Sequence, residues 1–153
     1  MRNGLPVLLV DTNVLVYMYD PRDVQKQDRA GEVFDRLVNE RRAVLSVQCL
    51  SEFFSTVTRR LPQHMTQLQA IERIDRLSHV CDVLDLTPQS VLDGCQAVVQ
   101  HPMSIWDALI WAVARANGVP YILTEDSDHG RVVGGVRYAN PFAPAFDLDA
   151  LGV

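Results

Sequence analysis

The apolar residues of this chain fall into two patterns that alternate along the sequence, short runs and longer stripes of helical spacing. Continuous runs rich in Val, Leu and Ile occur at 7–10, 43–45 and 119–124, and an alternating run occurs at 82–86. These segments are too short for isolated helices, and we interpret them as strands, the first of them fully buried. Val132–Val133 and Val136–Tyr138 flank a Gly-Gly pair and predict a small hairpin at one edge.

Between the runs, apolar residues three and four positions apart predict amphipathic helices. The stripes are Ala30, Val33, Phe34, Leu37 and Val38, then Leu50, Phe53, Phe54 and Val57, then Leu68, Ile71, Ile74 and Leu77, and finally Val91, Leu92, Cys95, Val98 and Val99. A further helix follows Ser104 and is apolar nearly all round, so we expect it at the centre of the fold. Strands that alternate with helices predict one α/β domain over residues 1–153, with a mainly parallel sheet.

The charge and composition narrow the possible functions. The net charge of −5 argues against a protein that coats nucleic acid through a broad basic surface. It does not exclude a nucleic-acid enzyme, because a bound metal inverts the charge of an acidic site. The three cysteines form no CxxC pair, which indicates buried thiols in a reducing compartment, the cytoplasm. The chain has no apolar run long enough to cross a membrane and no signal-peptide core at its start.

Four carboxylates occupy positions where a site could form. Asp11 and Asp126 follow strand ends, where open α/β sheets bind ligands, Glu52 lies beside an apolar helix stripe, and Asp107 lies in the first turn of the apolar helix. Each has a simpler explanation. Asp11 could cap a helix, Asp107 could complete a capping box with Ser104, Glu52 could be solvated, and Asp126 could close an Asx turn.

Taken together, the four acids are harder to explain as local structure. A buried carboxylate without a partner costs several kcal/mol or more by rough estimate. Carboxylates drawn together in a groove of low dielectric repel one another unless they share a proton or bind a cation. Oxygen ligands with no His or Cys among them favour magnesium or manganese over zinc. We therefore expect the four to converge on one site.

The segments around these acids resemble, in order, the four acidic motifs of the PIN domain, and within it the VapC toxins of bacterial type II toxin–antitoxin pairs. The matching segments are Leu9-Val10-Asp11-Thr12-Asn13-Val14-Leu15, Ser51-Glu52-Phe53, Trp106-Asp107-Ala108-Leu109-Ile110 and Leu123-Thr124-Glu125-Asp126. The resemblance implies a three-layer α/β/α sandwich with strand order 3-2-1-4-5. It implies a ribonuclease that depends on Mg²⁺ or Mn²⁺ and leaves a 5′-phosphate and a 3′-hydroxyl.

The resemblance also assigns roles to single residues. It makes Asp11, Glu52, Asp107 and Asp126 the metal-binding and catalytic quartet. Asp128 matches an acid that some members add for a second metal. Two polar residues, Asn13 and Thr124, match side chains that hold the acids or a phosphate. VapC-like toxins are dimers and are neutralised by an antitoxin segment that enters the active-site groove, so RNA, an antitoxin and a second copy are the expected partners.

Other functions fit the sequence less well. A phosphotransfer receiver domain needs a lysine after its last strand, but the only lysine is Lys26. A topoisomerase–primase domain pairs a DxD motif such as 126–128 with an early glutamate, where this chain has Asp11. A PIN-like module that binds RNA or protein without cutting, and a housekeeping RNA-processing nuclease, both remain open.

The expected antitoxin groove is acidic, with Phe53, Phe54 and Trp106 nearby. Such a groove suits a peptide with apolar anchors and an arginine that pairs with Asp11 and Asp107 in place of the metal. We expect at least two of the three aromatic residues to belong to the core instead.

Overall fold

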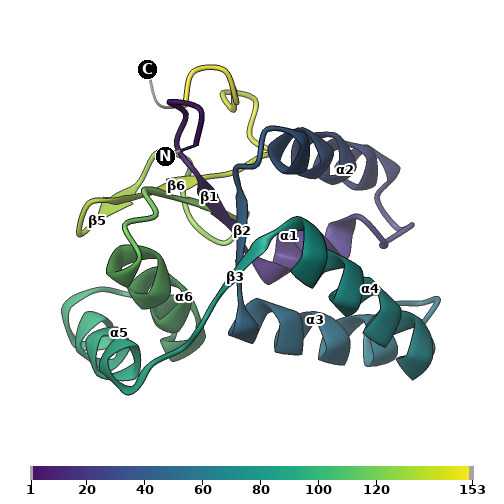
Figure 1. The fold of residues 1–153 in the computed structure, drawn as a ribbon, viewed down its shortest axis with the longest axis horizontal. Helices are drawn as coiled ribbons and strands as arrows, with labels where there is room; N and C mark the ends of the chain where they lie inside the picture. Colours follow the sequence, from purple (N-terminus) through teal and green to yellow (C-terminus); the bar gives the residue numbers. More distant parts are fainter. Residues whose placement is uncertain (1, 152–153) are drawn as a thin grey trace.

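The computed structural model describes residues 2–151 and shows a six-stranded sheet with helices around it (Figure 1). Every neighbouring pair of strands is parallel except the last. In spatial order the strands are β3 (Asp82–Leu84), β2 (Ala43–Ser46), β1 (Leu8–Val10), β4 (Tyr121–Leu123), β6 (Val136–Ala139) and β5 (Val132–Val133). The α/β class with a mainly parallel sheet is confirmed.

The strand order departs slightly from the expected 3-2-1-4-5. The sixth strand in sequence, not the fifth, lies beside β4, and β5 forms the outer edge. Gly134 and Gly135 both have positive φ, which lets the chain reverse within two residues and pair β5 antiparallel with β6. The predicted hairpin is confirmed, and it supplies both the inner strand and the edge.

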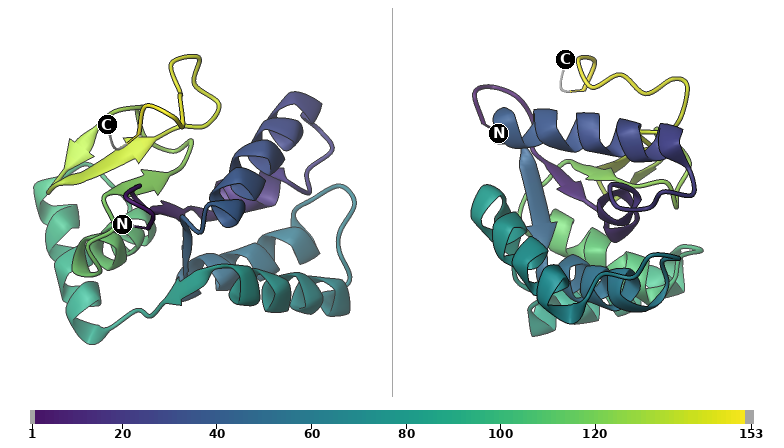
Figure 2. Two further views of the ribbon diagram at one scale, coloured as in Figure 1. Left: turned by 45° about the horizontal axis from the view of Figure 1, so that its top comes forward. Right: turned by 90° about the vertical axis from the view of Figure 1, so that its right-hand side faces the viewer.

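Six helices connect the strands over the described residues. They are α1 (Thr12–Tyr17), α2 (Val24–Asn39), α3 (Val47–Arg59), α4 (Gln67–Val80), α5 (Pro88–Gln100) and α6 (Ile105–Ala116). The N-terminus of each helix is capped by a side-chain oxygen that accepts a hydrogen bond from a backbone N–H of the first turn. The capping residues are, in order, Asp11, Asp23, Ser46, Thr66, Thr87 and Ser104. Figure 2 shows α2 on one side of the strands and α3, α4 and α6 on the other, in three layers.

The core lies between these layers. The whole of β1 is fully buried, and every residue of α6 from Ala108 to Ala114 is buried, as the all-round apolar pattern predicted. Burial of both elements fixes the positions of the residues that follow β1 and that open α6. Those residues include Asp11 and Asp107.

The predicted apolar stripe of α5 is wrong in its orientation. Val91, Leu92, Cys95, Val98 and Val99 are all exposed, Val99 to 86%. The face that packs on α6 is made of small residues instead, Ser90, Gly94 and Ala97. A Cβ at position 94 would lie 3.0 Å from Cδ2 of Leu109, so only a small side chain lets the helices approach this closely. In α4 the predicted stripe is partly wrong too, because Leu68 and Ile71 are exposed.

The three cysteines are all free thiols. Cys49 and Cys81 are buried free thiols, as predicted, whereas Cys95 is exposed with the rest of its stripe. Among residues 2–151, no helix has the length and apolarity that a bilayer crossing requires.

Candidate active site

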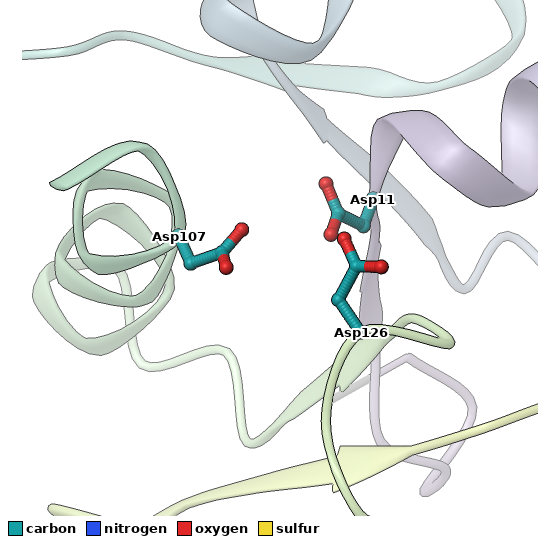
Figure 3. Close-up of side chains that lie close together, drawn as sticks. All are labelled: Asp11, Asp107 and Asp126. Carbon is teal, nitrogen blue, oxygen red and sulfur yellow. The ribbon is translucent and has the colours of Figure 1, made fainter. Parts of the chain in front are cut away.

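Three of the predicted acids meet at the carboxyl end of the sheet. Asp11 follows β1, Asp126 lies in the loop after β4, and Asp107 points toward both from the first turn of α6 (Figure 3). One carboxylate oxygen from each residue lies within 4.8 Å of the other two. Three elements that are distant in sequence therefore bring their negative charges to one point.

Asp11 is the buried member of this cluster. Its carboxylate accepts hydrogen bonds from the backbone N–H of Thr12 at 2.7 Å and from the Thr124 hydroxyl at 2.9 Å. Burial nevertheless raises the pKa of Asp11 to about 7, and the nearby charges of Asp107 and Asp126 act in the same direction. The two hydrogen bonds oppose this rise because they stabilise the ionised form. A bound cation would do the same far more strongly.

Thr124 connects the members of the site. Its buried hydroxyl donates to Asp11 and accepts hydrogen bonds from the Asn13 side chain at 2.8 Å and from the backbone N–H of Asp126 at 3.1 Å. The Asn13 amide also donates to Oδ2 of Asp11, the oxygen that accepts from Thr124, at 3.4 Å. The two polar residues that the sequence singled out therefore contact Asp11, and Thr124 also fixes the start of the Asp126 loop.

Asp107 does not close the capping box that offered the simpler explanation for it. Its backbone N–H donates to the Ser104 hydroxyl at 3.1 Å, but its carboxylate accepts no hydrogen bond from any residue in 2–151. In α4, by contrast, Thr66 and Gln69 form the reciprocal pair. The pKa of Asp107 is raised, first by burial and then by the charges of Asp126 and Glu52.

Glu52 lies on the same cleft but is engaged differently. Its carboxylate accepts hydrogen bonds from the Thr12 hydroxyl at 3.0 Å and from the Gln48 amide at 2.6 Å. It is not part of the group of three acids that lie within 4.8 Å of one another. Its place beside Asp107 makes it a fourth negative charge at the edge of the cluster.

The loop after β4 separates its two aspartates. Asp126 is exposed and faces the cluster, and in the described chain its carboxylate accepts no hydrogen bond. Asp128 is also exposed, but it lines neither the cleft nor the cluster. The structure therefore brings Asp11, Asp107 and Asp126 together, places Glu52 beside them and leaves Asp128 apart. His129 accepts a hydrogen bond from the backbone of Asn140 and does not reach the site.

A second group of interacting side chains, which no sequence pattern indicated, lies at the mouth of the cleft. Glu125 accepts hydrogen bonds from the Tyr17 hydroxyl and, at 2.8 Å, from the Lys26 ammonium, which lies over the Tyr17 ring. The hydrogen bond to Glu125 raises the pKa of Lys26. Lys26 is far from Glu125 in sequence. The spacing of apolar residues predicts helices, but it does not predict which charged side chains will form an ion pair.

The donor set fits a hard divalent cation. The cluster lines an open cleft of about 310 Å³, so its oxygens can be reached from solvent. The three oxygens lie within 4.8 Å of one another, which is close to the roughly 4.2 Å between opposite oxygen ligands of one Mg²⁺. The nearby thiol of Cys49 is no competitor, because burial raises its pKa to about 12 and keeps it protonated. Asp11, Asp107 and Asp126 could hold the cation, with Glu52 beside it.

Comparison with known proteins agrees with this geometry. The PIN domain family matches residues 8–135, which include all four acids of the predicted quartet. The chain belongs to the PIN domain family. No curated protein sequence matches this PIN domain.

VapC toxins, alone or in VapBC complexes, are among its solved structural neighbours. VapC20 of Mycobacterium tuberculosis, described as a toxin that cleaves the sarcin–ricin loop, is 23% identical with a TM-score of 0.59, over 75% of this chain and 86% of its own. A DNA-bound VapBC from Salmonella typhimurium is 17% identical with a TM-score of 0.64, over 90% of this chain and 99% of its own. VapBC2 of Rickettsia felis, bound to a DNA fragment from its promoter, is 14% identical with a TM-score of 0.64, over 88% of this chain and 98% of its own. At these identities the likeness establishes the fold.

Proposed function

We propose that this PIN domain is an endoribonuclease that uses Mg²⁺ or Mn²⁺ to hydrolyse RNA phosphodiester bonds, and that it is the toxin of a toxin–antitoxin pair in the cytoplasm. The observation that carries the nuclease proposal is the meeting of Asp11, Asp107 and Asp126 from three separate elements. Burial and mutual repulsion raise the pKa values of Asp11 and Asp107, so a bound cation would stabilise the ionised carboxylates of the cluster. The VapC neighbours support the role of toxin.

The cation, once bound, would activate water for attack at phosphorus and neutralise charge on the phosphate oxygens. The residues of the chain hold and position it. Thr124 and the Thr12 backbone N–H keep the buried Asp11 carboxylate oriented and favour its ionised form. Asp126 and Asp107 would complete the ligand set, and in Figure 3 their carboxylates approach the cluster from opposite sides. The cleft requires no protein nucleophile for a one-step hydrolysis.

The experiment for this proposal compares RNA cleavage by the wild type, Asp126→Asn and Asp28→Asn. Asp28 is exposed on α2 and lines no part of the cleft, so it is the matched loss of one carboxylate. We expect cleavage that stops with chelator and returns with Mg²⁺ or Mn²⁺. Asp126→Asn should lower the rate by more than about 100-fold, because even loss of an outer-shell partner costs about 10- to 100-fold. RNA binding without cleavage under all conditions would favour a non-cleaving module.

Two protein partners belong to the same proposal. The exposed apolar stripe of α5, formed by Val91, Leu92, Cys95, Val98 and Val99, suits a contact with a second copy, because such patches mark interfaces. The acidic cleft suits an antitoxin arginine that pairs with Asp11 and Asp107. Phe53 is fully buried and Phe54 is partly buried against the core, so neither is a freely exposed anchor for that peptide.

The antitoxin proposal is tested by co-expression with the product of the neighbouring reading frame. We expect co-purification and inhibition of cleavage. An arginine-to-alanine change in the tail of that product should weaken inhibition, while excess Mg²⁺ should compete with the unchanged tail. Full inhibition by the alanine variant would contradict the exchange of arginine for metal, and no binding would identify a housekeeping nuclease.

A further inference from the structure

A second groove, of about 480 Å³, adjoins the acidic cleft and has no role in holding a cation. We call it the Trp106 groove; its residues are Gln48, Ser51, Ser55, Thr56, Arg60 and Trp106, together with Glu52. Glu52 and Thr56 line both the groove and the cleft. The groove and the cleft are therefore neighbours along α3, and a bound chain that extends past Glu52 and Thr56 would contact both.

Trp106 is unusual for a large aromatic residue because 63% of its surface is exposed. The other tryptophan, Trp111, lies one turn further along α6, is 4% exposed and donates its indole N–H to the carbonyl of Val133 at 2.9 Å. Trp106 takes part in no aromatic pair and no cation–π contact within the described part of the chain. The fold thus leaves one broad apolar ring uncovered, directly beside Asp107.

Hydrogen bonds hold the backbone of Trp106 in place, although its ring is exposed. The Gln48 amide donates to the backbone carbonyl of Trp106 at 3.0 Å and to the Glu52 carboxylate at 2.6 Å. This link ties the first turn of α6 to α3 across the groove. A ligand that contacts the indole is therefore anchored to a backbone segment that is held beside α3 and that carries Asp107 as its next residue.

The remaining lining is polar. The Ser51 hydroxyl donates to the carbonyl of Val47 at 3.1 Å, and Ser55 and Thr56 add two further hydroxyl groups. Arg60 is exposed and forms no ion pair with any residue from 2 to 151. An aromatic face, hydroxyl groups and an unpaired guanidinium suit a nucleotide, which offers a base to stack, a ribose and a phosphate. An apolar peptide anchor would leave the hydroxyl groups and the guanidinium without a role.

We propose that the Trp106 groove is a nucleotide subsite for single-stranded RNA. Trp106 stacks on the base of a nucleotide next to the scissile phosphate, and Arg60 contacts a backbone phosphate on the same side. This inference rests on the proposed ribonuclease function and adds to it a requirement for an unpaired base at one fixed position. Trp106 acts here as a substrate-binding residue, separate from the carboxylates that hold the cation.

The test combines substitutions with RNA that lacks single bases. The substrate is a single-stranded oligonucleotide that the wild type cuts at one mapped bond, together with copies in which one nucleotide in turn is abasic. For the wild type, loss of one base beside the cut should lower kcat/KM by about 5- to 150-fold, the worth of one stacked base. Trp106→Ala should lower cleavage of the intact RNA by a similar factor and should then be insensitive to the abasic nucleotide at that position.

Two matched variants separate stacking from general damage. Trp106→Phe keeps a smaller ring and should retain most of the base dependence. Val132→Ala removes an apolar side chain that is 51% exposed on the edge strand β5 and does not line the Trp106 groove. This variant should behave as the wild type does. Arg60→Ala should reduce the slope of log affinity against log salt by about 0.7, whereas Trp106→Ala should leave the slope unchanged.

A binding measurement keeps the inference separate from the nuclease proposal. The same oligonucleotides are titrated against Asp126→Asn, with and without Trp106→Ala. If the wild type cuts no RNA but binding still depends on Trp106 and one base, the nuclease proposal fails and the subsite stands. If Trp106→Ala and the abasic nucleotide act additively in cleavage and in binding, the subsite is overturned while the nuclease proposal stands. Loss of antitoxin binding alone in Trp106→Ala would also overturn it, and would assign the groove to the protein partner.

Discussion

The hydroxyl of Thr124 donates a hydrogen bond of 2.9 Å to Oδ2 of Asp11, a residue 113 positions away in sequence. Parallel pairing of β1 with β4 makes this contact possible, because Val10 lies opposite Leu123 and the next residue of each strand follows in register. The bond joins the only buried acid of the cluster to the loop that carries Asp126. It is therefore the point where a small change should alter cation binding without altering the ligands.

Thr124→Val should weaken Mn²⁺ binding by roughly 10- to 100-fold, the usual cost of losing a hydrogen bond behind a metal ligand. The valine keeps the shape of the side chain but removes one of the hydrogen bonds to the Asp11 carboxylate, which raises the pKa of Asp11 further. Thr124→Ser keeps the hydroxyl and is the matched control, with affinity close to that of the wild type. Isothermal titration with Mn²⁺ measures the effect, and equal affinities for the valine and serine variants would contradict it.

Asp11 should make the cation-free protein less stable as the pH rises. Its folded pKa is about 7 and its ordinary value is 3.8, so between these values the folded state binds more protons than the unfolded state. This contribution of Asp11 to stability is complete below about pH 4 and is lost as the pH rises through 7, by at most about 4 kcal/mol at 1.36 kcal/mol per pKa unit. Asp11→Asn cannot titrate and should show a shallower decline, and Mg²⁺ should no longer raise its melting temperature.

Denaturant unfolding between pH 4 and 8 in the presence of chelator measures this dependence. The wild type with Mg²⁺ is the internal control, because a cation that binds the ionised carboxylates should remove the decline. A wild type that ignores Mg²⁺, together with an Asp11→Asn variant that melts much lower, would identify the cluster as a structural element.

Gly94→Val should lower the free energy of unfolding by about 1–3 kcal/mol, the typical cost of overpacking. A Cβ at this position meets Leu109 at 3.0 Å and the backbone oxygen of Ala108 at 3.3 Å, so α5 must move away from α6. Gly31→Val in α2 is the matched control, because nothing lies within 4 Å of its Cβ. That control should be neutral or slightly stabilising, by about 0.5 kcal/mol from helix propensity. Equal effects of the two changes would show that helix packing is not the cause.

Val99→Lys should disrupt self-association through α5. Val99 is 86% exposed, so the change should leave the stability of the monomer nearly unaltered while placing a charge in the proposed interface. We expect the dimer Kd to rise at least about 10-fold, the equivalent of 1.4 kcal/mol. Leu68→Lys, on the exposed face of α4, is the matched control. Sedimentation equilibrium distinguishes them, and a larger effect of Leu68→Lys would move the interface to α4.

Sequence by itself determined the alternation of strands and helices and the places where acids meet strand ends. Leu8, Leu9 and Val10 are entirely apolar and are therefore buried. Ser46, Thr66 and Ser104 cap the helices that they precede, because their side chains form hydrogen bonds with the nearby backbone. These features depend on neighbours within a few positions. For the same reason the motif resemblance could place Asp11, Glu52, Asp107 and Asp126 on their elements before any coordinates.

Only the tertiary structure decided which faces became interior and which acids met. Apolar spacing identified a stripe on α5 but not its direction, because close packing on α6 selected the small face of Ser90, Gly94 and Ala97. Equally, nothing local distinguishes an exposed Trp106 from a buried Trp111, and only the folded chain shows that Asp126 reaches the cluster while Asp128 lies apart. Those outcomes depend on contacts between residues far apart in sequence, which strand pairing and helix packing create only when the whole chain has folded.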